Sequence, residues 1–286
     1  MQSIHRLDHL RNVVAQWRVA EETIALVPTM GALHEGHLTL VRAAREKADR
    51  VAVSIFVNPT QFGPNEDLDA YPRTLEADSR LLDAEGVDAL WAPDAATMYP
   101  DGFSTSIAVD GVSGDFCGRS RPGHFAGVAT VVCKLFNQVQ PDLALFGEKD
   151  WQQLAVIRTM ARDLDLARPA VDAILGVPTV READGLALSS RNRYLDAEQR
   201  AQAAALPAAM REAIDAIESG APVDETLRAL EAALLGSGFS KVDYAALADA
   251  LSLEQIDAPG KAPARLLVAA HIGGTRLIDN MAVRAR

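Results

Sequence analysis

Two histidines, separated by a glutamate and a glycine, follow the first buried apolar run of the chain. His34 and His37 lie in segment 28–38, between the apolar run 23–27 and a stretch with helical spacing. At the opening of a helix this spacing places both imidazoles on one face, beside free backbone N–H groups that favour an anion. Gly36 lets a ligand approach the backbone closely. An isolated pair of this kind is more often ordinary capping, but its position after a strand favours a phosphate clamp.

A second polar segment follows the apolar run 51–57 in the same way. Asn58 and Gln61 offer hydrogen-bond donors and acceptors without titrating, which suits the recognition of hydroxyl or carboxylate groups. An Asn-Pro pair also opens turns, and this would explain the segment by itself. Both interpretations stay open on these residues alone.

A third polar segment, 147–153, follows the apolar run 143–146. Lys149 is a mobile point charge that can follow charge developing on a phosphate. Gln153 lies one helical turn further on and can reach the same pocket. The charged start of a solvated helix would have a similar sequence, so the segment alone indicates little.

A fourth segment, 184–193, contains Ser189, Ser190 and Arg191. Two hydroxyls followed by a guanidinium form a compact phosphate-binding set, because Arg can engage two phosphate oxygens at once. The alternative is a polar loop that caps the helix expected from residue 196. Arg119 and Arg121 also allow two interpretations: they form a mobile clamp on the ligand, or they are merely solvated.

Strand and helix patterns alternate through the first part of the chain. Parallel strands buried on both faces are expected at 23–27, 51–57, 87–91 and 143–146, and helices are expected from residue 38, at 71–85, 125–139 and 151–163. These repeated units predict an α/β fold with a Rossmann-like, doubly wound parallel sheet. Ligands of such sheets bind outside the carboxyl ends of the strands, which is where the polar segments begin.

The composition changes after about residue 176. Helices are expected at 196–219, interrupted by Pro207, and at 224–235. Strands 265–272 and 275–283 flank Gly273 and Gly274, the linker of a tight hairpin. The sequence therefore predicts two domains, a Rossmann-like domain at 1–176 and a smaller C-terminal α+β lid domain at 177–286.

Composition and charge restrict the class of protein. The 286 residues carry a net charge of −11, which disfavours sequence-independent binding of nucleic acid. We expect no membrane segment and no signal peptide. Cys117 and Cys133 lack the spacing of a zinc site, so we expect reduced thiols in a cytoplasmic protein, with Cys133 in the core rather than a nucleophile. His271, in a C-terminal strand, is expected to be structural.

Taken together, the four segments resemble the pantothenate synthetase (pantoate–β-alanine ligase) family, within the superfamily of nucleotidyl transferases that carry an H-x-G-H element. The similar runs are 28–38, 54–62, 121–125 continuing through 147–153, and 184–193. The H-x-G-H element alone marks the superfamily. Its combination with Gly-Glu-Lys-Asp and Leu-Ser-Ser-Arg, in this order, is much more specific to the family.

The resemblance implies a two-step reaction without a covalent protein nucleophile. Pantoate would attack Mg-ATP to give pantoyl adenylate and pyrophosphate, and β-alanine would then displace AMP to give pantothenate. It also implies Mg²⁺ as cofactor and a homodimer as the assembly. The magnesium ligands are not identified by the sequence.

Residue roles are implied by the same resemblance. His37 would be a proton donor, and His34, Lys149 and Arg191 would complete the catalytic set. The residues expected to bind ATP are Met30, Gly31, His34, Gly36, His37, Gly147, Glu148, Lys149, Asp150, Val180, Leu188, Ser189, Ser190 and Arg191. Gln61 and Gln153 would bind pantoate, with Asn58 nearby.

Two other functions are compatible with a phosphate clamp. A nucleotidylyltransferase would join a nucleotide to a phosphorylated acceptor, but it would need a basic acceptor pocket where this chain has amides. A nucleotide-binding sensor would grip ATP without activating an acid. The resemblance favours the ligase over both.

Overall fold

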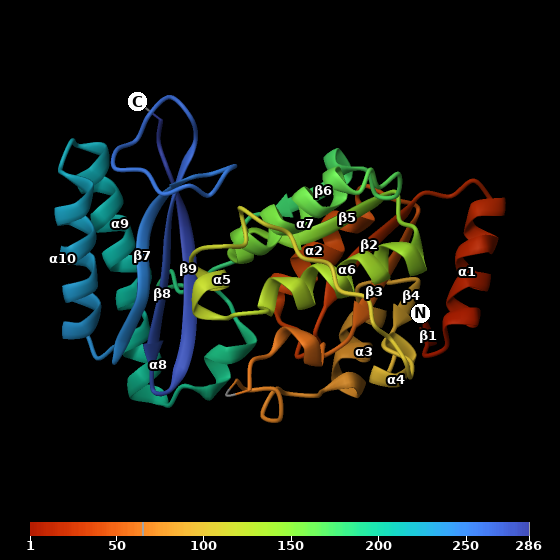
Figure 1. Cartoon of the computed structure of the whole chain (residues 1–286). Helices are drawn as coiled ribbons and strands as arrows, with labels where there is room; N and C mark the ends of the chain where they lie inside the picture. Colours follow the sequence, from red (N-terminus) through yellow and green to blue (C-terminus); the bar gives the residue numbers. More distant parts are fainter. Residues whose placement is uncertain (65, 286) are drawn as a thin grey trace. The chain divides into compact units, whose positions relative to one another are not determined.

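A six-stranded, fully parallel sheet forms the centre of the first part of the molecule. The structure is a computed structural model that describes residues 1–64 and 66–285. The strand order is β1-β4-β3-β2-β5-β6 (Figure 1). The strands are β1 Gln2–Ile4, β2 Ile24–Thr29, β3 Arg50–Ile55, β4 Ala89–Trp91, β5 Leu143–Gly147 and β6 Ile174–Val177. Residues 24–27 of β2 are fully buried, because both faces of a central parallel strand are covered by helices.

Helices connect the parallel strands, as the alternating pattern predicted. They are α1 Leu7–Val19, α2 Glu35–Arg45, α3 Leu75–Ala84, α4 Ala95–Met98, α6 His124–Val139 and α7 Trp151–Asp163. A 3₁₀ turn, η1 Pro59–Gln61, follows β3, and η2 Glu148–Asp150 follows β5. The chain runs from β2 towards β3 and β4, and then returns to β5 on the other side of β2. The neighbouring strands β2 and β5 therefore mark the switch point at which doubly wound sheets bind ligands.

A three-stranded antiparallel sheet and two packed helices form the second part. Strands β7 Lys241–Asp249, β8 Ala264–Ile272 and β9 Thr275–Val283 pair in sequence order. Helices α9 Ala205–Glu218 and α10 Val223–Gly236 pack against each other and against this sheet, as Figure 1 shows. Gly273 and Gly274 have φ values of 55° and 77°, the left-handed conformation that a two-residue hairpin requires. The α/β fold with a smaller C-terminal α+β part is thus confirmed.

The chain divides into two compact units whose segments are not continuous in sequence. Unit 1 comprises residues 1–113, 121–148 and 153–178, and unit 2 comprises residues 114–120, 149–152 and 179–286. The shorter elements of unit 2 are α5 Cys117–Ser120, η4 Ser190–Tyr194 and α8 Ala197–Ala203. The division into domains 1–176 and 177–286 stays a prediction.

Several local details differ from expectation. The helical stretch 196–219 breaks at Ala204 rather than at Pro207, since α8 ends at Ala203 and α9 begins at Ala205. Pro207 lies in the first turn of α9, where its missing N–H costs no intrahelical hydrogen bond. The helix expected at 71–85 begins only at Leu75. Strands β1, β6 and β7 and helix α1 were not predicted.

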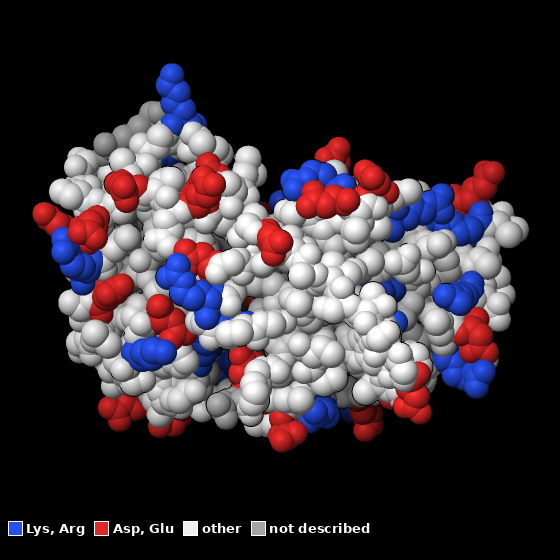
Figure 2. Space-filling model, in the orientation of Figure 1, with Lys and Arg blue, Asp and Glu red and all other residues white. Residues whose placement is uncertain are grey.

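The surface carries both signs of charge. Figure 2 shows Lys and Arg interspersed with Asp and Glu on the visible face, without a continuous basic area there. In the described part of the chain, every helix is too short or too polar to cross a membrane.

Candidate functional site

Three of the four polar segments leave the sheet at neighbouring strands. β2 pairs with β3 on one side and with β5 on the other, all in parallel. Residues 30–37 follow β2, residues 58–61 follow β3, and Gly147 ends β5. Because carboxyl ends of parallel strands lie at one edge of a sheet, these segments share the edge at the switch point.

The two histidines begin α2 and cap it reciprocally. His34 is the N-cap residue, and its Nδ1 accepts a hydrogen bond from the N–H of Gly36 over 3.2 Å. The N–H of His34 donates in turn to Nδ1 of His37 over 3.3 Å. The ring centroids of the two imidazoles are 4.1 Å apart. The helix start thus holds both rings side by side, as the spacing predicted.

This capping corrects one expectation and fixes the chemistry of the rings. The N–H groups of His34, Gly36 and His37 are used by the cap, since His37 N–H donates to the His34 carbonyl over 2.8 Å. They are therefore not free to bind an anion. A ring nitrogen that accepts an N–H is unprotonated, so each neutral imidazole carries its proton on Nε2. Both rings can present an Nε2–H donor.

A buried carboxylate holds the turn that precedes the histidines. Asp78 of α3 is 2 % exposed and accepts the N–H groups of Ala32 and Leu33, each over 2.9 Å. Thr74 Oγ1 donates to the same carboxylate over 3.0 Å. Gly31 and Ala32 have left-handed φ values of 80° and 50°. The sequence did not indicate this role, because an Asp within a helical pattern is usually solvated.

The side-chain amides of Asn58, the residue before η1, and Gln61, the last residue of η1, form a hydrogen-bonded pair. Asn58 is buried, and its Nδ2 donates to Gln61 Oε1 over 3.1 Å. Gln61 Nε2 lies 2.9 Å from the sulfur of Met30, the residue that follows β2. The structure thus brings together Asn58, Gln61 and Met30, which lie in two separate segments of the sequence.

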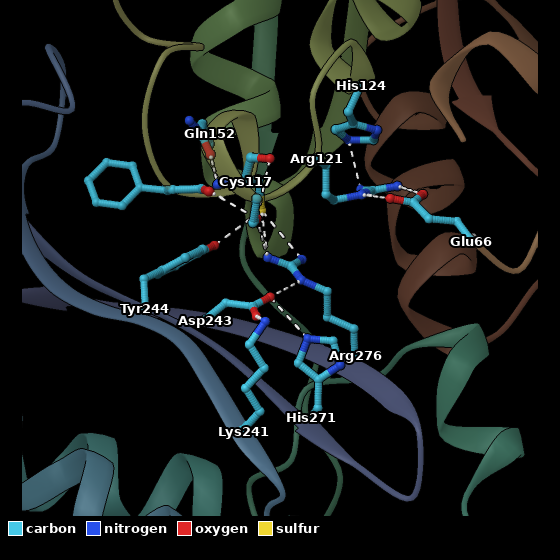
Figure 3. Close-up of polar contacts among 12 residues, drawn as sticks. Glu66, Cys117, Arg121, His124, Gln152, Lys241, Asp243, Tyr244, His271 and Arg276 are labelled. Atoms are coloured by element: carbon cyan, nitrogen blue, oxygen red, sulfur yellow. Dashed lines mark hydrogen bonds and ion pairs between the residues drawn. The ribbon is translucent and has the colours of Figure 1, made fainter. Parts of the chain in front are cut away.

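The main chain of Gln61 is contacted by His124, whose ring lies against the ion pair of Arg121 and Glu66. Arg121 Nε donates to Glu66 Oε1 over 2.7 Å, and its Nη1 lies 3.0 Å from His124 Nε2 (Figure 3). His124 Nδ1 lies 2.8 Å from the Gln61 carbonyl oxygen. Burial alone would raise the pKa of Glu66, but Arg121 outweighs burial and lowers it. Arg121 is therefore a partly buried structural residue and not a solvated or mobile clamp.

In unit 2, the main chain of Lys149 is held by the C-terminal sheet. Asn280 of β9 donates its Nδ2 to the Lys149 carbonyl over 2.9 Å, and its Oδ1 accepts from Arg265 of β8. The Arg265 guanidinium lies 3.4 Å from the centre of the Trp151 ring. The Lys149 ammonium lies 4.0 Å from Asp150 Oδ2, and its side chain is 20 % exposed.

The fourth segment also belongs to unit 2. Leu188 N–H donates to the Val180 carbonyl over 3.0 Å, so two residues expected to bind ATP are neighbours across a short irregular hairpin. Ser189 is the N-cap of η4 and its Oγ accepts the N–H of Arg191 over 3.3 Å. Ser190 is buried within η4.

Three further residues of the expected set lie in unit 1. A Cβ at Gly147 would meet no atom within 4 Å, so the space beside its Cα is open. Glu148 packs beside Gly176 of β6, where an added Cβ would come within 3.0 Å of its side chain. Gln153, in the first turn of α7, is half-buried. Among residues 1–64 and 66–285, no group of three or more His, Cys, Asp or Glu side chains could hold a metal ion.

A polar cluster outside the predicted set surrounds Cys117 in unit 2 (Figure 3). The Cys117 sulfur lies 3.1 Å from the Tyr244 hydroxyl and 3.6 Å from two guanidinium nitrogens of Arg276. Arg276 and His271 also contact Asp243, at 2.8 and 3.0 Å. His271 is thus part of a structural network, as expected.

The Asp243 carboxylate has a strongly perturbed pKa. Burial alone would raise this pKa, but hydrogen bonds from Lys241, Arg276 and His271 outweigh burial and hold it well below the ordinary value. Cys133 of α6 is half-buried, whereas the sequence predicted a place in the core. Burial raises the pKa of its thiol, which keeps the thiol protonated and unsuited to act as a nucleophile.

Comparison with known proteins adds independent evidence. The family model of pantoate-β-alanine ligase matches residues 2–282. The chain is 66% identical to pantothenate synthetase of Novosphingobium aromaticivorans over 283 residues, which is 99% of each chain. It is 52% identical to the pantothenate synthetase of Caulobacter vibrioides, covering 98% of each.

Solved structures of the same family have the same fold. The pantothenate synthetase of Thermus thermophilus matches with a TM-score of 0.90 and 46% identity, covering 98% of this chain and 99% of that one. The pantoate-β-alanine ligase of Francisella tularensis, in complex with beta-gamma ATP and β-alanine, matches with a TM-score of 0.83. That match has 33% identity and covers 99% of this chain and 97% of the other.

The family match favours the ligase over the nucleotidylyltransferase that the phosphate clamp alone left open. It extends over nearly the whole chain and includes both the parallel sheet and the C-terminal part. The chain therefore belongs to the pantoate–β-alanine ligase family and is an ATP-dependent ligase that forms the C–N bond between pantoate and β-alanine.

Proposed function

We propose that this ligation proceeds through a pantoyl adenylate. A carboxylate oxygen of pantoate attacks the α-phosphorus of ATP, the bond from that phosphorus to the bridging oxygen breaks, and pyrophosphate leaves. The amine of β-alanine then attacks the acyl carbon, the bond from this carbon to the phosphate oxygen breaks, and AMP leaves. The amine nitrogen releases its extra proton to solvent or to a neighbouring base. Neither step requires a covalent protein nucleophile.

We propose that His34 and His37 bind the phosphates of ATP through their Nε2–H groups. The observation that carries this proposal is the reciprocal cap, which uses both Nδ1 atoms as acceptors. Donors held in place before the reaction stabilise charge developing on the pyrophosphate without reorganisation during the step. His37 is the proposed proton donor. Gly31, Gly36 and Met30 are proposed to border the nucleotide.

For unit 2, we propose that Lys149, Ser189, Ser190 and Arg191 bind phosphate oxygens. A mobile ammonium and a guanidinium are suited to charge that moves between phosphates during the reaction. The hydrogen bond from Asn280 to the Lys149 carbonyl supports the role of Lys149, because it fixes the main chain from which the ammonium extends.

We propose that the nucleoside is bound by a further group of residues. The open space beside Gly147, at the end of β5, supports its place in this group. The other proposed members are Glu148, Asp150, Val180 and Leu188.

Gln61 and Gln153 are proposed to bind pantoate. Gln61 lies beside Met30 at the edge of the sheet where β2 ends. Two amides can donate to and accept from the oxygen atoms of the acid at any physiological pH, because they do not titrate.

We propose that Mg²⁺ enters with ATP. This cation prefers oxygen ligands, keeps several of its waters and is commonly carried by substrate phosphates. When bound, it would neutralise phosphate charge during the attack of pantoate. We also propose that the enzyme acts in the cytoplasm as a homodimer, that residues 1–176 and 177–286 form its two domains, and that the second domain serves as a lid. Light scattering of the purified protein would test the dimer.

The mechanism is tested by measuring AMP release with Mg-ATP, pantoate and β-alanine, omitting each in turn. We expect AMP only when acid and amine are both present. Replacing His37 or Lys149 by Ala should lower the rate by about two to four powers of ten, as for loss of one transition-state donor. His9→Ala and Lys47→Ala, which remove exposed side chains of the same types, should leave it unchanged. Near-normal turnover of His37→Ala would remove that residue from the mechanism.

A further inference from the structure

The side-chain amide of Asn58 has an orientation that backbone groups determine. Its Oδ1 accepts the N–H of Thr60 over 3.3 Å, and its Nδ2 donates to the carbonyl of Gly127 over 3.2 Å. A backbone N–H can only donate and a backbone carbonyl can only accept, so exchanging the oxygen and the nitrogen would break both contacts. Asn58 is 1 % exposed, which makes such a mismatch costly.

The fixed amide of Asn58 determines in turn how Gln61 is oriented. The same Nδ2 of Asn58 donates to Gln61 Oε1 over 3.1 Å. The carbonyl end of Gln61 therefore faces Asn58, and its NH₂ end faces Met30, with Nε2 2.9 Å from the sulfur. Thioether sulfur is only a weak acceptor, so an oxygen atom of a substrate would be a better partner for this NH₂ group.

Tyr99, which is far away in the sequence, holds Asn58 in place. The Tyr99 hydroxyl lies 2.8 Å from Asn58 Oδ1 and 3.3 Å from Thr60 Oγ1. Burial raises the pKa of Tyr99, and its hydrogen bonds with Thr60 and Asn58 oppose this shift, so the phenol keeps its proton at neutral pH and donates it to Asn58 Oδ1. A simple turn at Asn58 would explain the contact with Thr60 N–H but not the contacts with Tyr99, Gly127 and Gln61.

Gly127 of α6 is required for the close approach of this helix to η1. A Cβ at position 127 would lie 2.4 Å from the Thr60 carbonyl oxygen and 2.8 Å from Gln61 Cα. Both are backbone atoms, which cannot turn aside as a flexible side chain could. Glycine here lets the carbonyl of residue 127 reach Asn58 and places Gln61 at the edge of the sheet.

We propose that Asn58, Tyr99 and Gly127 are positioning residues that fix the Gln61 amide with its N–H donors directed at an oxygen atom of pantoate. The proposal rests on the proposed role of Gln61 in binding this acid. Asn58 itself does not contact the substrate, since both ends of its amide are already used within the protein. The site thereby favours an acid that presents an acceptor oxygen to residue 61.

The test first compares KM for pantoate and KM for ATP in three single variants. Gln61→Ala is the reference and should raise KM for pantoate at least about 10-fold, the effect of losing a well-placed hydrogen bond. Asn58→Asp should raise it similarly, because a carboxylate only accepts and would turn the NH₂ of Gln61 towards residue 58. Tyr99→Phe should raise it about 3- to 10-fold. KM for ATP should change less than about 2-fold in each single variant.

The double variant Asn58→Asp with Gln61→Ala distinguishes positioning from a general loss of structure. If Asn58 acts through Gln61, the effect of Asn58→Asp on KM for pantoate disappears in the Gln61→Ala background. Additive effects would overturn the proposal, as would an unchanged KM in Tyr99→Phe. Tyr244→Phe, which removes another partly buried hydroxyl from unit 2, serves as the control and should leave KM for pantoate unchanged.

The two proposals fail in different ways. If Gln61→Ala binds pantoate normally, the proposed function of Gln61 is wrong. If Gln61→Ala is impaired while Asn58→Asp and Tyr99→Phe are normal, only the positioning proposal is wrong. Tyr99→Phe removes one oxygen atom, so it remains informative even if Asn58→Asp does not fold.

Discussion

Replacing Asp78 by Ala tests whether one buried carboxylate holds the turn before His34 and His37, the proposed phosphate-binding histidines. The change removes the acceptor for the N–H groups of Ala32 and Leu33, which are 0 % and 3 % exposed. Each buried donor left without a partner costs about 1–3 kcal/mol. Ala gains roughly 0.5 kcal/mol of helix propensity over Asp, and a water molecule can replace part of the lost hydrogen bonding. We therefore expect a loss of about 3–4 kcal/mol in the free energy of unfolding.

Urea unfolding followed by tryptophan fluorescence measures this loss in the relevant unit. Trp17 and Trp91 belong to unit 1 and Trp151 to unit 2, so an early transition in unit 1 should dominate the signal. Asp83→Ala is the matched control on the same helix, because its carboxylate is 67 % exposed and pairs with the N-terminus. Such a surface pair contributes at most about 1 kcal/mol. A loss below about 1 kcal/mol in Asp78→Ala would refute the reasoning.

The milder change Asp78→Asn extends the same test to activity. Asn keeps one acceptor oxygen, so we expect a smaller loss of about 2 kcal/mol, within the range in which a domain stays folded. Its NH₂ group would face one of the two N–H groups and displace the turn that leads to His34. The rate should fall at least about 10-fold, since small displacements of catalytic groups have large effects. A normal rate would show that the turn tolerates the displacement.

Three further results are expected. Gly127→Ala should lower the free energy of unfolding by about 1–3 kcal/mol, because the added Cβ meets backbone atoms. The control Gly236→Ala at the end of α10, where the added Cβ has open space, should not lower it. Equal stabilities of the two variants in urea would contradict this reasoning. Asn280→Ala should raise KM for ATP about 10-fold by releasing the main chain of Lys149; an unchanged KM would exclude that anchoring role. The pKa of Asp243 is lower in the folded protein than in the unfolded chain, where it is about 3.9. The ionised carboxylate therefore stabilises the fold at pH values above about 3.9, and this stabilisation is lost as the pH falls further. Asp243→Asn should therefore flatten the decline of stability between about pH 4 and pH 2, and an unchanged slope in acid unfolding would contradict the assignment.

The fold could be predicted closely from the sequence, because burying one face or both faces of an element sets the spacing of apolar residues along the chain. Continuous apolar runs predicted the central strands β2, β3 and β5, and their order with helices predicted a parallel sheet. Gly273 and Gly274 predicted the hairpin of β8 and β9, since only left-handed residues close such a turn. Strands β1 and β6 were not predicted, because neither contains a continuous apolar run: Gln2 and Ser3 are polar, and Gly176 interrupts β6.

The polar contacts that shape the candidate site had no comparable pattern in the sequence. The segments beginning at residues 30, 58 and 147 could be assigned to one edge of the sheet because each follows a parallel strand. The residues that hold them could not, since Tyr99 reaches Asn58 across 41 positions and Asn280 reaches Lys149 across 131. Hydrogen bonds between distant segments impose no spacing on their partners.

The sequence by itself therefore determined the fold class, the family and the segments that carry chemistry. Only the tertiary structure decided the state of the groups within them. It showed that the N–H groups at the start of α2 are used by the cap, and that Asn58 is satisfied within the protein. Arg121 proved to be held by Glu66. The physical reason is that donor and acceptor capacity is set by three-dimensional neighbours, whereas apolar periodicity depends only on which face of an element is buried.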